Sequence, residues 1–481
     1  MVQRGHPRDC GGDGEGASVA RDGVSTRRLL RGLGTALLLA LPASRARAVP
    51  SFARQTGMPC TTCHTAFPQL TPFGRYFKLT GYTLAGGGTH LPPLAVMAQA
   101  GFTHTAKDQA PEDLPPRIDP NDNASFNQVS FFYAGRLLGP YSEAAFGETV
   151  GGALEHVGTF LQGTWDGVGR EWSWDNMEVR AATTTRLAGQ NAILGAYVNN
   201  NPTMQDVWNT APAWSFPFSQ SGIAPTPSAA PLIAGGVAQQ SVGFGAYAML
   251  ADLLYLEVGG YRTLPSNLQS HLGVDPSGET QIDNLAPYWR VALERTFGPH
   301  SLEVGTYGLA AHTFPGRDRS QGHDAFTDVA LDTQYQYLSD PHDVTIALNW
   351  IHEDQTLHAS QPLGLAQNPS NTLWTATATG SYLFDKTYGL DVQYFVSGGS
   401  RDAVLYGNRT GGPGSEGWIF QLNYLPFNRG GGPRFWPMSN LKLSLQYTLY
   451  QRFDGAHANF DAAGRSAPNN NTLYLEAWLA F

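Results

Sequence analysis

The residues best suited to do chemistry in this chain form one pentapeptide, Cys60-Thr61-Thr62-Cys63-His64. Two thiols at this spacing can each add to a haem vinyl group from one turn of backbone. The imidazole that follows can then bind the iron from the same turn. The motif therefore predicts one covalent haem c, attached through Cys60 and Cys63, with His64 as the proximal iron ligand.

Three other roles compete for this motif: a Cys60–Cys63 disulfide, a thioredoxin-like redox pair, and half of a zinc site. A thioredoxin-like pair belongs in a βαβ context, and the surrounding sequence does not have that pattern. A zinc site needs a second pair of ligands nearby, and only the isolated His90 and His104 are available. Covalent haem attachment is the prediction that fits the motif best.

Residues 1–48 are predicted to be a signal peptide. Arg27, Arg28 and Arg31 form a basic region, an apolar run follows from Leu33 to Leu41, and Ala46-Arg47-Ala48 is typical of a cleavage site. Cleavage there would remove Cys10, so an exported chain would keep only the two cysteines of the pentapeptide.

Residues 49–92 are predicted to be a monohaem cytochrome c segment. Between Val49 and His90 there is no Asp or Glu, but Arg54, Arg75 and Lys78 are present. We expect these three cations to pair with the haem propionates and to raise the reduction potential. A segment of about forty residues cannot bury a haem and also build a stable core. It must therefore pack against something larger.

Residues 93–481 have the pattern of a transmembrane β-barrel. About sixteen segments, from 94–105 to 471–481, alternate apolar with polar residues, and 441–449 is a clear example. Period two gives each strand one apolar and one polar face. Charged residues make up 14% of the chain, against about 25% in soluble domains. Beyond the leader, no apolar run approaches the roughly 20 residues of a spanning helix.

The connections between these segments alternate between short and long. Ala188-Gly189, Ala251-Asp252 and Asp385-Lys386 predict tight hairpin turns, whereas 264–287 and 452–470 are long and rich in turn residues. Short turns on one rim and long loops on the other are typical of bacterial outer-membrane barrels. We therefore predict an all-β fold, an outer-membrane antiparallel barrel whose lumen is plugged by the cytochrome segment. Polar residues expected to line the lumen are Glu257, Asp328, Asp332, Asp391 and Glu476.

The charge of the chain argues against one class of partner. The formal net charge is −9, and the part of the chain after the leader has no cluster of Lys and Arg. A protein that binds nucleic acid needs such a basic surface, so no nucleic-acid partner is predicted. The partners we expect are outer-membrane lipid, an electron donor and an electron acceptor.

The N-terminal segment resembles a known family over residues 50–82. The runs PSFARQTG at 50–57, CTTCH at 60–64, FPQLTPFGR at 67–75 and FKLTGY at 77–82 resemble the fused monohaem cytochrome–porins of iron-oxidising bacteria. Over the barrel the resemblance is mainly architectural. It implies haem on Cys60 and Cys63 with axial His64, a sixteen-stranded barrel, and electrons taken from extracellular Fe(II). Fe(II) is carried over by analogy, because a barrel fold does not itself specify what is oxidised.

The distal iron ligand has four candidates: Met58, His90, Met97 and His104. Met97 shares a strand face with Gln99 and Thr103, so we expect its side chain to point into the lumen. A Met ligand would raise the potential, which suits Fe(II) as the donor. The alternative role of Met97 is to fill space between the plug and the barrel wall.

Three functions are therefore considered. The first is an outer-membrane electron conduit of the iron:cytochrome c oxidoreductase type, which takes electrons from an extracellular donor such as Fe(II) and passes them to a periplasmic cytochrome. The second is a diffusion porin with a structural or gating haem plug. The third is a secreted soluble haem enzyme such as a peroxidase, and the barrel pattern counts against it.

Overall fold

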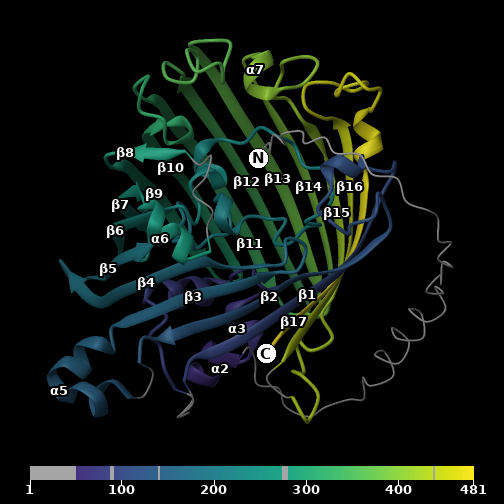
Figure 1. The fold of residues 1–481 in the computed structure, drawn as a ribbon. Helices are drawn as coiled ribbons and strands as arrows, with labels where there is room; N and C mark the ends of the chain where they lie inside the picture. Colours follow the sequence, from purple (N-terminus) through teal and green to yellow (C-terminus); the bar gives the residue numbers. More distant parts are fainter. Residues whose placement is uncertain (1–49, 87–91, 139–140, 274–279, 437–438) are drawn as a thin grey trace, which may run out of the picture. The chain divides into compact units, whose positions relative to one another are not determined.

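The computed structural model describes residues 50–86, 92–138, 141–273, 280–436 and 439–481. The predicted signal peptide and the candidate ligand His90 lie outside these residues. The described residues belong to one compact unit, Ala43–Phe481, and they are dominated by a single large sheet (Figure 1).

That sheet closes on itself as a barrel. It contains seventeen strands, of which sixteen form the wall, each antiparallel to the next, and the pairing of β1 with β17 closes the ring. The three-residue β8 only extends the wall where β9 begins. This confirms the prediction of about sixteen strands. In chain order the strands are β1 (Leu94–Thr105), β2 (Asn123–Arg136), β3 (Val157–Asp166), β4 (Glu171–Leu187), β5 (Gln190–Asn199), β6 (Ser241–Leu250), β7 (Leu254–Thr263), β8 (Gln281–Asp283), β9 (Ala286–Phe297), β10 (His300–Phe314), β11 (Asp324–Ser339), β12 (His342–Thr356), β13 (Ser370–Phe384), β14 (Tyr388–Gly399), β15 (Glu416–Tyr424), β16 (Asn440–Arg452) and β17 (Thr472–Ala480).

The two faces of the wall differ as the alternation predicts. On β7, Val258 is 68% exposed on the outside, whereas its neighbour Glu257 is 3% exposed on the inside. A closed ring of strands leaves no unpaired edge, so the outer face can meet lipid without unsatisfied backbone groups. Other exposed apolar side chains on the wall are Leu293, Val304, Leu331, Leu348, Leu422 and Leu475.

The rims also follow the prediction, with three departures, one of which is the long β15–β16 link, residues 425–439, on the rim of the tight turns. The turns at 188–189, 251–252 and 385–386 have positive φ at both residues, which suits the right-handed twist of paired strands. On this short-turn rim, however, the β2–β3 link contains α5 (Ser142–Leu154). On the opposite rim, where the other connections are long, the β3–β4 turn spans only residues 167–170.

Two parts of the chain fill the lumen. The first is the N-terminal segment, which carries α2 (Pro50–Thr56), α3 (Cys60–Cys63) and α4 (Pro72–Leu79) and lies at the end of the barrel where β1 begins and β17 ends (Figure 1). The second is the β5–β6 link, residues 200–240, which we call the inner loop. The remaining α-helices among the described residues are the short α6 (Ser266–His271) and α7 (Ala403–Tyr406). None of the helices in the described ranges is long and apolar enough to cross a membrane.

The inner loop is fastened to the wall by a buried arginine. The Arg290 guanidinium on β9 lies 2.9 Å from Asp206 of the loop and 2.5 Å from Asp332 of β11. It also stacks over the Trp208 ring, 4.6 Å from the centroid. Because both carboxylates and the guanidinium are fully buried, removal of Arg290 would leave two buried carboxylates without their cation. The loop is therefore a fixed part of the lumen.

Candidate functional site

The Cys-x-x-Cys turn is held by the helix that follows it. Thr71, the N-cap of α4, donates from its backbone N–H to the carbonyl of Cys63 over 2.9 Å and from its hydroxyl to the carbonyl of Thr62 over 2.6 Å. Gly74 lies directly against this turn, because a Cβ there would be 2.1 Å from the Cys63 carbonyl oxygen. Only glycine permits this approach, so α4 fixes the shape of the motif.

His64 is oriented by its own loop. Its Nδ1 lies 3.1 Å from the carbonyl oxygen of Pro68, and an Nδ1–H donor there leaves the lone pair on Nε2. Burial lowers the pKa of His64, so the imidazole is neutral, which is the form that binds a metal. The side chain is thus prepared to act as a ligand through Nε2.

The two cysteines occupy different surroundings. Cys60 is buried, and Asn440 of β16 donates to its Sγ over 3.3 Å. Burial, followed by the influence of Cys60, raises the pKa of the Cys63 thiol to about 12. A reactive redox pair needs a lowered thiol pKa, so Cys63 lacks the activation that the thioredoxin-like alternative requires.

The loop between His64 and Leu70 is held by the barrel and the inner loop. The backbone N–H of Leu70 donates to Asn209 over 2.8 Å, and its carbonyl accepts from Gln336 over 2.9 Å. The carbonyl of Thr65 accepts from Asn428 over 2.9 Å. The motif is therefore supported by the barrel and the inner loop, as the small size of its segment led us to expect.

The three cations proposed as propionate partners point elsewhere. Arg75 is 1% exposed. Its guanidinium lies 2.7 Å from Glu294 on β9 and also donates to Ser301, Gln334 and Gln336.

Lys78 and Arg54 are also engaged. Lys78 Nζ donates to the carbonyls of Met204 and Asp206, each over 2.7 Å, and burial lowers the pKa of this lysine to about 7. Arg54 donates to the carbonyl of Leu94. These contacts tie the segment to the barrel and the inner loop. None of the three cations lines the cavity beside His64.

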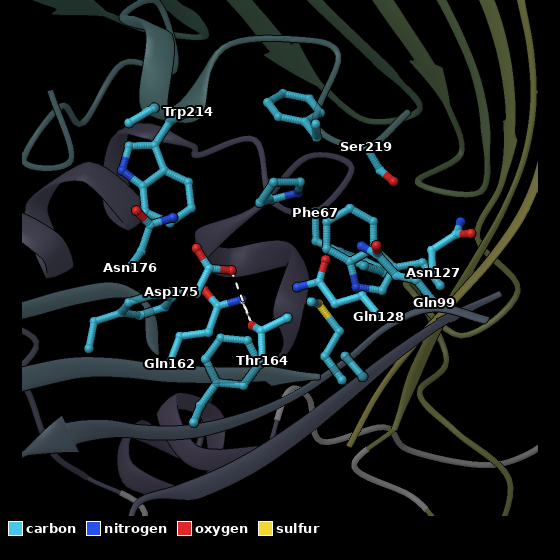
Figure 2. A pocket seen from close by; sticks show the side chains of 18 of the residues that line it. Phe67, Gln99, Asn127, Gln128, Gln162, Thr164, Asp175, Asn176, Trp214 and Ser219 are labelled. Carbon is cyan, nitrogen blue, oxygen red and sulfur yellow. Dashed lines mark hydrogen bonds between the residues drawn. The ribbon is translucent and has the colours of Figure 1, made fainter. Parts of the chain in front are cut away.

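A cavity of about 770 Å³ lies beside His64. Its lining is mostly apolar, and the polar residues Gln162, Thr164, Asp175 and Asn176 gather on one side of it in Figure 2. This volume lies within the roughly 300–1,000 Å³ of cofactor sites. Apolar residues in the lining include Phe52, Phe67, Met97, Phe132, Phe160, Trp214, Phe218 and Trp478.

Met97 is the candidate distal ligand that this cavity brings near His64. It is 8% exposed and belongs to the same lining as His64, which agrees with the expected inward direction of its side chain. Met58 is 36% exposed, and His104 hydrogen-bonds to Asp122 over 2.7 Å; neither lines the cavity. His64, with a free Nε2, and the Met97 thioether line the cavity, whereas Cys60 and Cys63 do not line it and lie in the helical turn just before His64; this donor set fits a haem c.

Several site residues were not foreseen from the sequence. Asn209, Gln336, Asn428 and Asn440 hold the motif, and each lies far from it in the chain. Their only signal was a polar residue on the lumen side of a strand or within a link. Trp214, on the inner loop, lines the cavity and has Lys78 Nζ 4.8 Å from its ring centroid.

The sequence matches no protein-family model and no curated protein. Among solved structures, the chain is similar to OprB of Pseudomonas putida, with 11% identity and a TM-score of 0.43, covering 81% of this chain and 93% of that one. It is similar to the outer membrane channel DcaP of Acinetobacter baumannii, with 10% identity and a TM-score of 0.40, covering 81% and 96%. It is also similar to Salmonella typhi OmpF in complex with daunomycin, with 9% identity and a TM-score of 0.40, covering 81% of this chain and 97% of that one. The closed sixteen-strand wall with its apolar outer face makes this chain an outer-membrane β-barrel that contacts lipid.

Proposed function

We propose that this protein carries electrons across the outer membrane, with one haem c held in the lumen by Cys60, Cys63 and His64. A bound haem would supply a one-electron couple inside a barrel that otherwise insulates. The donor is extracellular, with Fe(II) as the form implied by the resemblance, and the acceptor is a periplasmic cytochrome. Each Fe(II) gives up one electron to become Fe(III), and one electron leaves toward the periplasm.

The observation that carries this proposal is the arrangement around His64. Pro68 holds the imidazole so that Nε2 is left for a metal, and the ring lines a large, mostly apolar cavity. Cys60 and Cys63 lie within one helical turn of it. Phe52 and Phe67 supply apolar cover, and Met97 is proposed as the distal ligand.

The test uses the full-length protein purified from outer membranes. A pyridine haemochrome spectrum should show haem c, and the Cys60→Ala, Cys63→Ala variant should lack covalent haem. Fe(II) should then reduce the haem of the wild-type protein within the time of a turnover. Covalent haem in the double variant would refute the attachment site.

A diffusion porin is the second candidate, and the barrel architecture itself favours it. The cavity beside His64 shares Pro115 and Gly222 with a second cavity of about 650 Å³ among the long loops. Solutes could enter along this path. If small solutes pass through reconstituted barrels while Fe(II) fails to reduce the haem, the porin function is correct and the conduit is not.

A further inference from the structure

The cavity beside His64 runs toward the outer rim of the barrel. At one end it is lined by His64 and Phe67 of the N-terminal segment. At the other end it is lined by Val168 and Gly169, in the short β3–β4 turn, and by Pro115 of the β1–β2 loop. Both of these connections lie on the long-loop rim, opposite the short hairpin turns. One cavity therefore joins the candidate haem ligand to the extracellular side.

The shortness of the β3–β4 turn is what leaves this path open. Most other connections on that rim are long, and the inner loop folds back into the lumen. The β3–β4 turn spans only residues 167–170 and is closed by Asp166, whose side chain accepts from the backbone N–H of Val168 over 2.8 Å. A longer loop here would extend over the mouth of the cavity.

Two carboxylates line this cavity, whereas the buried Lys78 and Lys442 lie behind its aromatic lining, over Trp214 and Trp478. The residues that line the cavity include Asp166 and Asp175 and, among those that the structure describes, no Lys or Arg. Asp175 accepts from the Thr164 hydroxyl over 3.1 Å and from the Gln239 amide over 3.2 Å, so neutral donors hold it and leave its charge uncompensated. Figure 2 shows Asp175, Thr164 and Asn176 on the same side of the cavity. Walls of low dielectric constant strengthen the field of two such carboxylates.

We infer that the donor is a small hydrated cation that enters from the outer rim, and that Asp175 and Asp166 determine this specificity. The inference rests on the proposed function and deepens it, because it names the route, the charge class and the residues. Anionic reductants are repelled by the same two carboxylates. Particulate donors are too large for the cavity and would have to react from outside it.

The test compares a cationic with an anionic reductant on the haem-loaded, full-length protein. Stopped-flow absorbance gives the second-order rate constants for aqueous Fe(II) and for ascorbate at low ionic strength. In the Asp166→Asn, Asp175→Asn variant the Fe(II) rate constant should fall about tenfold, while the ascorbate rate constant stays or rises. Added NaCl should reduce the difference between variant and wild type, because salt screens the two charges.

Glu148→Gln is the matched control. Glu148 is exposed on α5, on the opposite rim of the barrel, and does not line the cavity, so its loss should leave both rate constants near the wild-type values. Asp175→Asn alone gives a second variant, because asparagine can still accept from Thr164 and Gln239.

The outcomes separate the inference from the proposed function. If Fe(II) reduces wild type and the double variant equally fast, the route is overturned and the conduit stands. If both reductants slow by the same factor, the carboxylates act on the haem site rather than on donor charge, and the inference is also overturned. If neither reductant reduces the wild-type haem, the proposed function itself fails.

Discussion

Replacing Arg75 by methionine should release the N-terminal segment from the lumen. The guanidinium is almost fully buried, and its ion pair with Glu294 has an N–O distance of 2.7 Å. Removing one partner of a buried ion pair costs about 3–5 kcal/mol, since the other charge stays buried and uncompensated. Glu294 keeps two donors, the Trp208 indole N–H at 3.0 Å and the Ser301 hydroxyl at 3.4 Å. We therefore expect the lower end, about 3 kcal/mol.

That free energy determines how much of the protein has its N-terminal segment undocked. At about 1.36 kcal/mol per factor of ten, the undocked segment should become about 10²-fold more populated while the barrel stays folded. Limited proteolysis measures this, because cleavage of a transiently opened segment follows its open population when opening and closing are fast. Cleavage within residues 50–86 should accelerate by a similar factor.

Two further variants make this prediction sharp. Arg54→Met removes a partly buried arginine that donates to the Leu94 carbonyl, and the loss of one hydrogen bond costs about 0.5–1.5 kcal/mol. Adding Glu294→Gln to Arg75→Met removes the stranded charge and should restore part of the protection. The reasoning is refuted if Arg75→Met is cleaved no faster than Arg54→Met, or if the second substitution restores nothing.

Three other predictions concern the same segment. Gly74→Ala places a Cβ 2.1 Å from the Cys63 carbonyl oxygen and should destabilise the docked segment by about 1–3 kcal/mol. We expect a lower haem content per protein. Gly152→Ala is the control, because its Cβ would have nothing within 4 Å, and it should leave the haem content unchanged. Lys78 has its pKa lowered to about 7 by burial, against about 10.4 when undocked. The undocked state therefore binds more protons between these values, so protection from proteolysis should rise from pH 7 to 9 and Lys78→Met should flatten this slope. Met97→Ala should lower the haem midpoint potential and change the absorption spectrum; an unchanged spectrum and potential would leave Met97 a packing role.

The barrel could be predicted closely from the sequence because its rules are local. Alternation follows from the two faces of a strand, and paired turn residues such as Asp385-Lys386 mark the hairpins. The segments expected at 94–105, 171–187 and 190–199 coincide with β1, β4 and β5. Two features could not be predicted from the sequence. They are α5 in the β2–β3 link and the folding of residues 200–240 into the lumen. Both are links whose position depends on distant parts of the chain.

The site was predictable only in part, for the same reason. The motif that contains Cys60, Cys63 and His64 is contiguous, so its chemistry can be recognised from the sequence alone. The expected role of Arg75 and Lys78 came from their charge alone, and charge does not say which partner a side chain meets. In the structure Arg75 meets a carboxylate 219 positions away in the chain. Whether a haem occupies the cavity beside these residues stays a prediction.

The contents of the lumen bear on the choice between conduit and porin. The N-terminal segment and the inner loop are tied to each other by Lys78 with Met204 and Asp206 and by Leu70 with Asn209. Each is also tied to the wall, through Arg75 and Arg290. Displacing these two segments from the lumen would require the buried ion pairs to separate, at a cost of about 3–5 kcal/mol for each. Passage of an electron requires no such movement, since it needs only a donor at the outer mouth and a redox centre within reach of the periplasmic rim. The N-terminal segment and the inner loop are therefore fixed parts of the lumen, and a solute that crosses the barrel has to pass beside them.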